Sequence, residues 1–301
     1  MAHEETVYDA LDHAHGGEGH WAFGTGFDEP LAGVDTTVPD GVDPAELGEY
    51  CLMLGDDALV LSSRLAEWCS RAPDLEEDIA LANVALDLLG QARLLLARAA
   101  RADPSVVPAG GTAGPEDALA FFREQHAFRN VRLCELPNGD FARSAVRLLV
   151  FATWRLAVLA RLAGSADPVL AAIAAKGVKE LTYHRDYAAR WVIRLGDSTP
   201  VARARVEAAL AAVWPWVPEL FRTSAVEARL PGVAVDPAAV RAEVDAVLSE
   251  VLAAATLPVP ATVPAALVAG RAGRDGVHTE ALGYLLAEMQ SVARAHPGAT
   301  W

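Results

Sequence analysis

The chain has 301 residues, of which 52% are hydrophobic and only 7% aromatic, and its formal net charge is −15. This length and composition suit one large helical domain, or one domain with appendages. The acid excess argues against nucleic acid and anionic membranes as partners, because both require basic patches. The N-terminus lacks the basic and apolar regions of a signal peptide, and no long uncharged apolar segment is recognisable, so we expect a cytoplasmic protein with no membrane partner.

Residues 1–42 predict a flexible N-terminal tail. They are rich in Gly, Asp and Pro and show neither a helical nor a strand period. Half of the eight histidines fall in this stretch, at His3, His13, His15 and His20. Their spacing is unlike that of a closed zinc site, so adventitious metal affinity is favoured over a built site.

Apolar residues at three-four spacing predict four long helices, at residues 43–71, 74–101, 140–164 and 168–195. Short turns separate the members of each successive pair, so the four helices form two antiparallel hairpins. The segment between the hairpins predicts a further helix at 116–136, which stops at Pro137. Asp56, Asp57 and Glu67 flank the core face of the first helix, and acids in such positions are most often solvated.

The second predicted helix carries polar residues within an apolar run. Asn83, Asp87 and the pair Gly90 and Gln91 recur at steps of three and four, which places them on one line of the helix. The run is apolar enough to predict a buried helix. A buried carboxylate is costly unless it is paired, so neighbouring helices should supply partners for Asp87.

Beyond residue 195 the chain predicts less regular structure with three further helices, at about 198–213, 236–255 and 278–295. No strand pattern of any length is present. The predicted fold class is therefore all-α: a ferritin-like four-helix bundle of two antiparallel hairpins with additional C-terminal helices. We expect a single domain at 43–301, with the core bundle at 43–195 and a helical extension at 196–301.

Bundles of this plan build a di-iron centre from a Glu on each of two helices and Glu-x-x-His on each of the other two. In the helix at 74–101 the place of that motif is taken by Asp87-Leu-Leu-Gly90, which keeps a carboxylate but has no imidazole. In the helix at 140–164 the central turns offer Phe151 and Trp154 and no acid. Two ligands are thus missing from the pattern.

The helix at 168–195 also departs from the pattern. Glu180 and His184 are four residues apart rather than three, and Tyr183 occupies the histidine position. We therefore predict no catalytic residue and no cofactor or metal in this chain, with a degenerate remnant of a di-iron site at Asp87, Glu180, Tyr183 and His184. These side chains could satisfy one another as a buried network, and Glu180 and His184 could hydrogen-bond each other.

Five segments carry a resemblance to a known family: LGDDALVLSSRLAEWC, PDLEEDIALANVALDLLGQARLLL, FRNVRLCELPNGDF, AAKGVKELTYHRDYAARWVIRLGD, and HTEALGYLLAEMQ with the ending HPGATW. Over residues 45–301 the chain resembles the C subunits of 1,2-phenylacetyl-CoA epoxidases, which are bacterial multicomponent monooxygenases. The resemblance implies a ferritin-like subunit of phenylacetate catabolism that has lost its metal site. It also implies pairing with the related catalytic A subunit, which holds the di-iron centre and binds the acyl-CoA, and a separate reductase subunit that supplies electrons.

Two functions of different class follow. The favoured one is a non-catalytic scaffold subunit that pairs with a catalytic homologue. The alternative is an autonomous metal-dependent oxidase with a non-standard site, in which Asp57 or Glu67 joins Asp87, Glu180 and His184. A weaker idea is that Arg271 and Arg274 touch the phosphates of a CoA held by the partner, although Gly-rich arginine loops are usually solvated. Finally, the spacing of Cys51, Cys69 and Cys134 predicts buried reduced thiols rather than a metal site.

Overall fold

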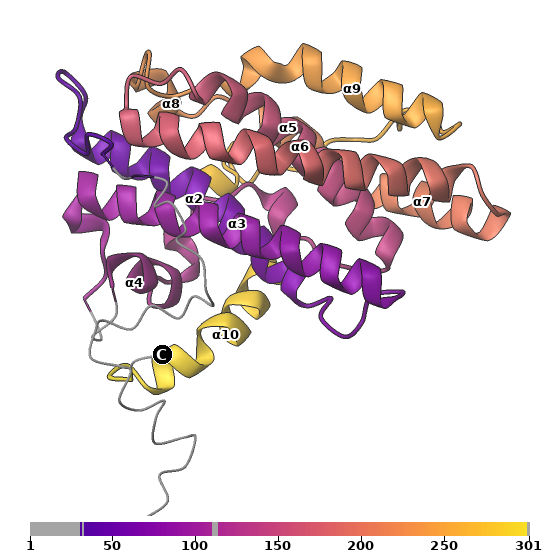
Figure 1. The fold of residues 1–301 in the computed structure, drawn as a ribbon, viewed down its shortest axis with the longest axis horizontal. Helices are drawn as coiled ribbons and strands as arrows, with labels where there is room; N and C mark the ends of the chain where they lie inside the picture. Colours follow the sequence, from indigo (N-terminus) through magenta and orange to yellow (C-terminus); the bar gives the residue numbers. More distant parts are fainter. Residues whose placement is uncertain (1–30, 32, 110–113, 300–301) are drawn as a thin grey trace, which may run out of the picture.

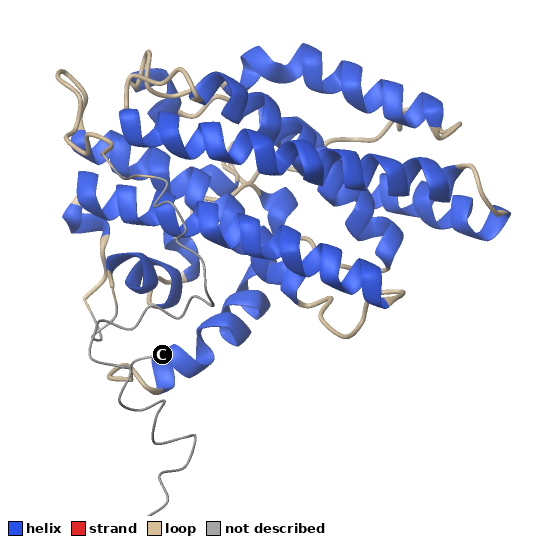
Figure 2. Ribbon diagram, viewed as in Figure 1, coloured by secondary structure: helices blue, strands red, loops and turns tan. Residues whose placement is uncertain are grey.

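The computed structural model describes residue 31, residues 33–109 and residues 114–299. The histidines of the predicted tail lie outside these residues. The described chain is built from helices, without any strand beyond one isolated bridge between Val268 and Arg271 (Figures 1 and 2). The prediction of an all-α fold is confirmed.

Four long helices form the two predicted hairpins: α2 (Pro44–Ala66), α3 (Leu75–Ala102), α5 (Phe141–Leu162) and α6 (Pro168–Gly196). Helix α2 packs along α3, α5 packs along α6, and α3 and α6 lie side by side. Every one of the four starts at an aspartate whose carboxylate accepts a backbone N–H of the first turn: Asp43, Asp74, Asp140 and Asp167. Such caps satisfy amides that have no partner within the helix. The arrangement agrees with a ferritin-like bundle.

Helix α2 ends at Ala66, five residues before the predicted end at residue 71. Trp68 lies just after this end, and its indole N–H donates to Ser144 Oγ on α5 over 3.0 Å. Ser70 then takes a left-handed conformation with φ of 64°, which no helix can continue.

The predicted helix at 116–136 is wrong beyond its first turns. The structure has a short α4 (Pro115–Phe121), followed by the 3₁₀ turns η2 (Gln125–Ala127) and η3 (Arg132–Glu135). The backbone N–H groups of Arg129 and Val131 donate over 2.8 Å to the carboxylates of Asp56 and Asp57 on α2. Bonds to buried anions from another helix replace the helical ladder, so tertiary context overrides the local pattern.

The C-terminal extension comprises α7 (Pro200–Val213), η4 (Trp214–Phe221), α8 (Ala225–Arg229), η5 (Pro237–Val240), α9 (Arg241–Ala254), η6 (Gly273–Asp275) and α10 (Glu280–Ala295). Helices α7 and α9 pack against α5, whereas α10 packs against α2 and α4. Figure 1 shows α9 and α10 on opposite sides of the bundle. A continuous apolar core runs from Leu47 of α2 to Leu286 of α10.

The segment before α2 differs from the expected mobile tail in its last residues. Val34, Val38 and Val42 pack against the core. Arg98 of α3 donates to the carbonyl oxygens of Thr36 and Thr37 over 2.6 and 3.2 Å. The expectation of three buried thiols is also only partly met, because Cys51 and Cys134 are buried but Cys69 is exposed.

Helix α3 is less buried than its composition predicts. It is long and apolar enough to cross a membrane, with a mean hydropathy of 1.5, yet only 44% of that window is buried within the chain. The inner face packs against α2 and α6, while four large apolar side chains on the other face are exposed: Leu75, Ile79, Leu86 and Leu89. The expectation of a fully buried helix is therefore wrong.

Candidate functional site

A chain of polar contacts crosses the interior of the bundle at the level where the four long helices face one another. Arg155 of α5 donates from Nε to Gln91 Oε1 on α3 over 3.1 Å. Gln91 in turn donates to Glu180 Oε2 on α6 over 2.8 Å. On the other side Arg155 Nη1 lies 3.8 Å from Asp57 Oδ2 on α2, and both of these side chains are almost fully buried. Each helix thus contributes one polar group.

Asp57 is held from its opposite side by the C-terminal extension. Arg274 of η6 binds the carboxylate in a bidentate manner, with distances of 3.0 Å from Nη1 to Oδ1 and 2.8 Å from Nη2 to Oδ2. Burial lowers the pKa of Arg274, but the contact with Asp57 outweighs it and leaves this pKa raised. Burial lowers the pKa of Arg155, and Asp57 offsets part of that effect. One carboxylate therefore serves two guanidinium groups in a water-poor interior.

The neighbouring Asp56 is neutralised separately. Arg123 binds both oxygens of its carboxylate, and Arg123 also lies 4.3 Å over the ring of Phe128. The acids Asp56 and Asp57 are fully buried, so the expectation that they are solvated is wrong. Their cations come from the segment after α4 and from the C-terminal loop, which sequence periodicity does not place next to α2.

The interior residues do not fit a di-iron centre. Such a centre needs carboxylates and imidazoles that converge on one point. The described residues contain no group of three or more His, Cys, Asp or Glu side chains that could hold a metal ion. The Arg155 guanidinium occupies the space between the helices, where it would repel a metal cation, and Asp57 is already bound by Arg274. The described interior residues therefore do not present the donor set that a di-iron centre needs.

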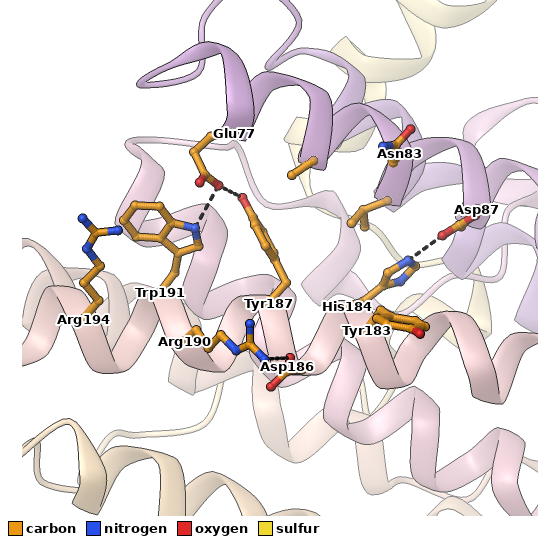
Figure 3. A pocket seen from close by; sticks show the side chains of 12 residues that line it. Glu77, Asn83, Asp87, Tyr183, His184, Asp186, Tyr187, Arg190, Trp191 and Arg194 are labelled. Carbon is orange, nitrogen blue, oxygen red and sulfur yellow. Dashed lines mark hydrogen bonds and ion pairs between the residues drawn. The ribbon is translucent and has the colours of Figure 1, made fainter.

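Asp87 and His184 meet at the surface of the bundle rather than at its centre. They line a groove of about 490 Å³ between α3 and α6 (Figure 3). Asp87 Oδ2 lies 2.9 Å from His184 Nε2, and the Asp87 side chain is 44% exposed whereas that of His184 is 3% exposed. A carboxylate only accepts, so Nε2 carries the proton and Nδ1 is left buried without a partner among the described residues. Burial lowers the pKa of His184, and the bond to Asp87 offsets part of this.

The other predicted remnant residues make no hydrogen bond to this pair. Glu180 accepts from Gln91 and lies 3.3 Å from Lys176 Nζ, so its carboxylate bonds elsewhere than to His184. Tyr183 is 77% exposed and lines the same groove as Asp87 and His184, without a hydrogen bond to either. The structure therefore brings Asp87, His184 and Tyr183 to one groove and joins Glu180 to the interior chain of contacts.

The far end of the groove is closed by a second polar contact. Glu77 of α3 accepts from the Trp191 indole N–H over 2.8 Å and from the Tyr187 hydroxyl of α6. Burial and the adjacent Glu77 carboxylate raise the pKa of Tyr187 well above its ordinary value. These contacts tie α3 to α6 at this end of the groove (Figure 3).

Sequence reasoning missed Arg155 and misplaced Arg274, the two arginines that contact Asp57 in the interior. Arg155 stands in the apolar run of the helix at 140–164, and a buried cation there was signalled only by the acid pair Asp56 and Asp57 in another apolar helix. Arg274 was expected in solvent or on a CoA phosphate. That idea is wrong for Arg274, because its guanidinium is bound to Asp57, to Met53 O and to Arg129 O. Arg271 remains exposed and donates to Asp275 O.

The sequence is similar to those of known proteins. The model of the family described as phenylacetic acid catabolic protein matches residues 35–301. The C subunit of 1,2-phenylacetyl-CoA epoxidase from Escherichia coli (strain K12) is 43% identical over 258 residues, which cover 85% of this chain and 99% of that protein.

Proposed function

The chain belongs to the phenylacetic acid catabolic protein family, and from this premise we propose that it is the non-catalytic scaffold subunit of a multicomponent phenylacetyl-CoA 1,2-epoxidase. A role in phenylacetate catabolism follows from the relationship to the C subunit of the Escherichia coli epoxidase. In the proposed assembly, a related ferritin-like A subunit holds the di-iron centre and the acyl-CoA, and a reductase subunit supplies electrons. The complex works in the cytoplasm.

The observation that supports the scaffold role is the buried guanidinium of Arg155. A ferritin-like oxygenase needs the space between its four helices for metal ligands. In this chain the space is taken by Arg155 with its contacts to Gln91 and Asp57. The interior therefore contributes rigidity instead of redox chemistry. Rigidity is what a catalytic partner requires from a neighbouring bundle, because a ligand set must be held close to its productive geometry.

The alternative of an autonomous oxidase needs donors that converge. Its candidate residues are separated in the structure: Asp57 is bound to Arg274, Glu180 to Gln91, and Asp87 to His184 at the surface. Glu67, the other acid of the first helix, is bound by Arg64 over 2.7 Å. No observation favours the alternative over the scaffold role.

Metal analysis of the complex tests the proposal. The chain is co-purified with the second ferritin-like subunit of the same cell, the two are separated under mild conditions, and iron is counted on each. We expect iron on the partner alone and epoxidation of phenylacetyl-CoA only by the assembled complex. About two irons per copy of this chain, together with oxidase activity of the chain alone that Asp87→Ala abolishes, would contradict the proposal.

A further inference from the structure

The carboxylate of Glu135 and the ring of His278 form a buried pair that the proposed function does not use. Glu135 lies in η3, and His278 stands two residues before the first residue of α10. The Glu135 side chain is 0% exposed and that of His278 is 1% exposed, and Glu135 Oε1 lies 2.6 Å from His278 Nδ1. Protein groups rather than water therefore decide which atoms of the pair carry protons.

Both ring nitrogens of His278 face acceptors. Nε2 lies 3.0 Å from the carbonyl oxygen of Phe128, and Nδ1 faces the carboxylate of Glu135. A carbonyl oxygen can only accept a hydrogen bond, so Nε2 carries a proton. If Nδ1 carries a second proton, the ring is an imidazolium.

The other contacts of Glu135 decide where that second proton lies. Oε1 also accepts from Asn130 Nδ2 over 3.0 Å, and Oε2 accepts from the backbone N–H and the hydroxyl of Thr279, each over 2.7 Å. Three donors from outside the pair thus point at the two carboxylate oxygens. Hydrogen bonds to the ionised form of a carboxyl group favour that form. Glu135 is therefore a carboxylate, and the proton between the two side chains belongs to Nδ1 of His278.

The other charged groups around the pair are bound elsewhere. Arg64 of α2 donates to the carbonyl oxygen of Glu135 over 3.1 Å, and Arg129 donates to that of Phe128 over 3.0 Å. Each nearby cation has its own carboxylate: Arg64 binds Glu67, Arg129 binds Glu49 and Arg123 binds Asp56. Titratable groups of the flanking segments are directed away: Glu280 binds Tyr284, Asp275 binds Ala272, and His126 is exposed. In the described part of the chain, only Glu135 pairs with the His278 ring.

The pair holds the start of α10 against the bundle. The side chain of Thr279 does not cap α10, and the bonds from Thr279 to Glu135 connect this helix end to η3 instead. Helix α10 lies at the edge of the molecule and covers α2 and α4 (Figure 1). If Nδ1 lost its proton, a nitrogen lone pair would face a carboxylate oxygen at 2.6 Å, and two acceptors at this distance repel each other.

We propose that Glu135 and His278 form a proton-dependent latch, which holds α10 to the bundle while the His278 ring carries two protons and releases the first turns of α10 when one proton is lost. The latch goes beyond the scaffold role and does not depend on any partner. We call these two residues the α10 latch.

The direction of the pH dependence follows from the charge. An ordinary histidine has a pKa of about 6.5, so the ring in the open state loses its proton above this value, whereas the closed latch keeps it. The stabilisation is complete below about pH 6.5 and is lost as the pH rises. Over the range in which only the closed state holds the proton, opening of α10 becomes about tenfold easier with each pH unit.

Nitrogen NMR of the full-length chain, with the ring signals assigned through the backbone of His278, tests the proton count. At pH 7.5 about nine tenths of an ordinary histidine is neutral. We expect both ring nitrogens of His278 to be protonated at this pH. A neutral ring with its lone pair on Nδ1 would place the proton on Glu135 and overturn the latch.

Hydrogen exchange between pH 7 and pH 9, corrected for the intrinsic pH dependence of exchange, tests the release of α10. Protection of its first turns in the wild type should fall by about tenfold per pH unit relative to α5. Glu135→Gln removes the charge but keeps an acceptor for Thr279, so its α10 protection should stay constant. Glu124→Gln is the matched control, because Glu124 binds Arg294 of α10 at the surface over 2.9 Å, and it should follow the wild type.

Two results of the exchange experiment would overturn the latch. One is a wild type whose α10 protection does not change over this range, and the other is a Glu135→Gln variant with the same pH dependence as the wild type. If Glu135→Gln does not fold, the proton count on His278 of the wild type still decides the question.

Discussion

At the scale of single residues, the two arginines on Asp57 have unequal surroundings. Arg274 makes two direct bonds to the carboxylate and bonds to two carbonyl oxygens. Arg155 bonds directly only through Nε, and its Nη1 and Nη2 have no hydrogen-bond partner among the described residues. Arg274 is therefore the group that compensates the buried carboxylate, while Arg155 depends on Asp57 to offset its own burial.

Replacement of Arg274 tests this hierarchy. Arg274→Ala leaves Asp57 buried next to the poorly bonded Arg155, so we expect the free energy of unfolding to fall by about 3–5 kcal/mol. Arg271→Ala, an exposed arginine of the same loop, should change it by less than about 0.5 kcal/mol. Urea denaturation of both variants measures the two values. Equal losses of unfolding free energy in the two variants would show that Arg274 does not stabilise the fold through its buried pair with Asp57.

The pairing of His184 predicts how stability depends on pH. Burial lowers the pKa of His184 below its ordinary value of 6.5, so the unfolded chain takes up a proton more readily than the folded one. The contribution of His184 is complete above that value and is lost as the pH falls below it. We expect the wild type to lose more unfolding free energy than His184→Gln between about pH 7.5 and pH 5.5. If the unfolding free energies of the two proteins change equally with pH over this range, His184 is not the source of the pH dependence.

At the scale of elements, the sequence predicted what depends on local chemistry. The four long helices and their aspartate caps follow from apolar periodicity and from residues adjacent in the chain. The prediction of a helix at 116–136 failed because backbone amides of this segment bond to Asp56 and Asp57, which are more than seventy residues away in the chain. The prediction of one buried network at the candidate site failed for the same reason. The interior contains Arg155 and Gln91, whereas Asp87 and His184 lie at the groove. Side-chain pairing between distant elements is not encoded in periodicity.

The caps of α3 and α6 provide a matched comparison of two helix starts. Asp74 is the exposed cap of α3, and its carboxylate accepts only from the backbone N–H of Glu77, over 2.9 Å. Asp167 caps α6 while it is fully buried and paired with Arg98 of α3. We expect Asp74→Ala to cost about 1 kcal/mol and Asp167→Ala about 3–5 kcal/mol, because the second change also strands Arg98. Thermal and urea unfolding measure both, and similar losses would show that the buried pair contributes no more than a cap.

At the scale of the whole molecule, buried carboxylates connect the bundle to its C-terminal extension. Three buried carboxylates share this feature, with one member of each pair on either side of residue 196: Asp57 with Arg274, Glu219 with Arg132, and Glu135 with His278. The distances are 2.6–2.8 Å and the carboxylates are at most 5% exposed. The division into a core bundle at 43–195 and an extension at 196–301 thus describes the order of the chain, but the two parts share these buried pairs.

A shortened chain tests whether the bundle can exist without the extension. A protein that ends at residue 195 keeps the four long helices apart from Gly196, the last residue of α6. However, Asp57, Glu135 and Arg132 lose their buried partners, and α5 loses the cover of α7 and α9. Uncompensated buried charge costs several kcal/mol per ion, which exceeds what a domain of this size can lose from a net stability of about 5–15 kcal/mol. We therefore expect helical far-ultraviolet circular dichroism without a cooperative thermal transition. A chain that ends at Ala295 retains every one of these pairs and should melt like the full-length protein. A cooperative transition in the chain that ends at residue 195 would mean that the four helices form an independent domain and that the extension was added to a bundle already stable without it.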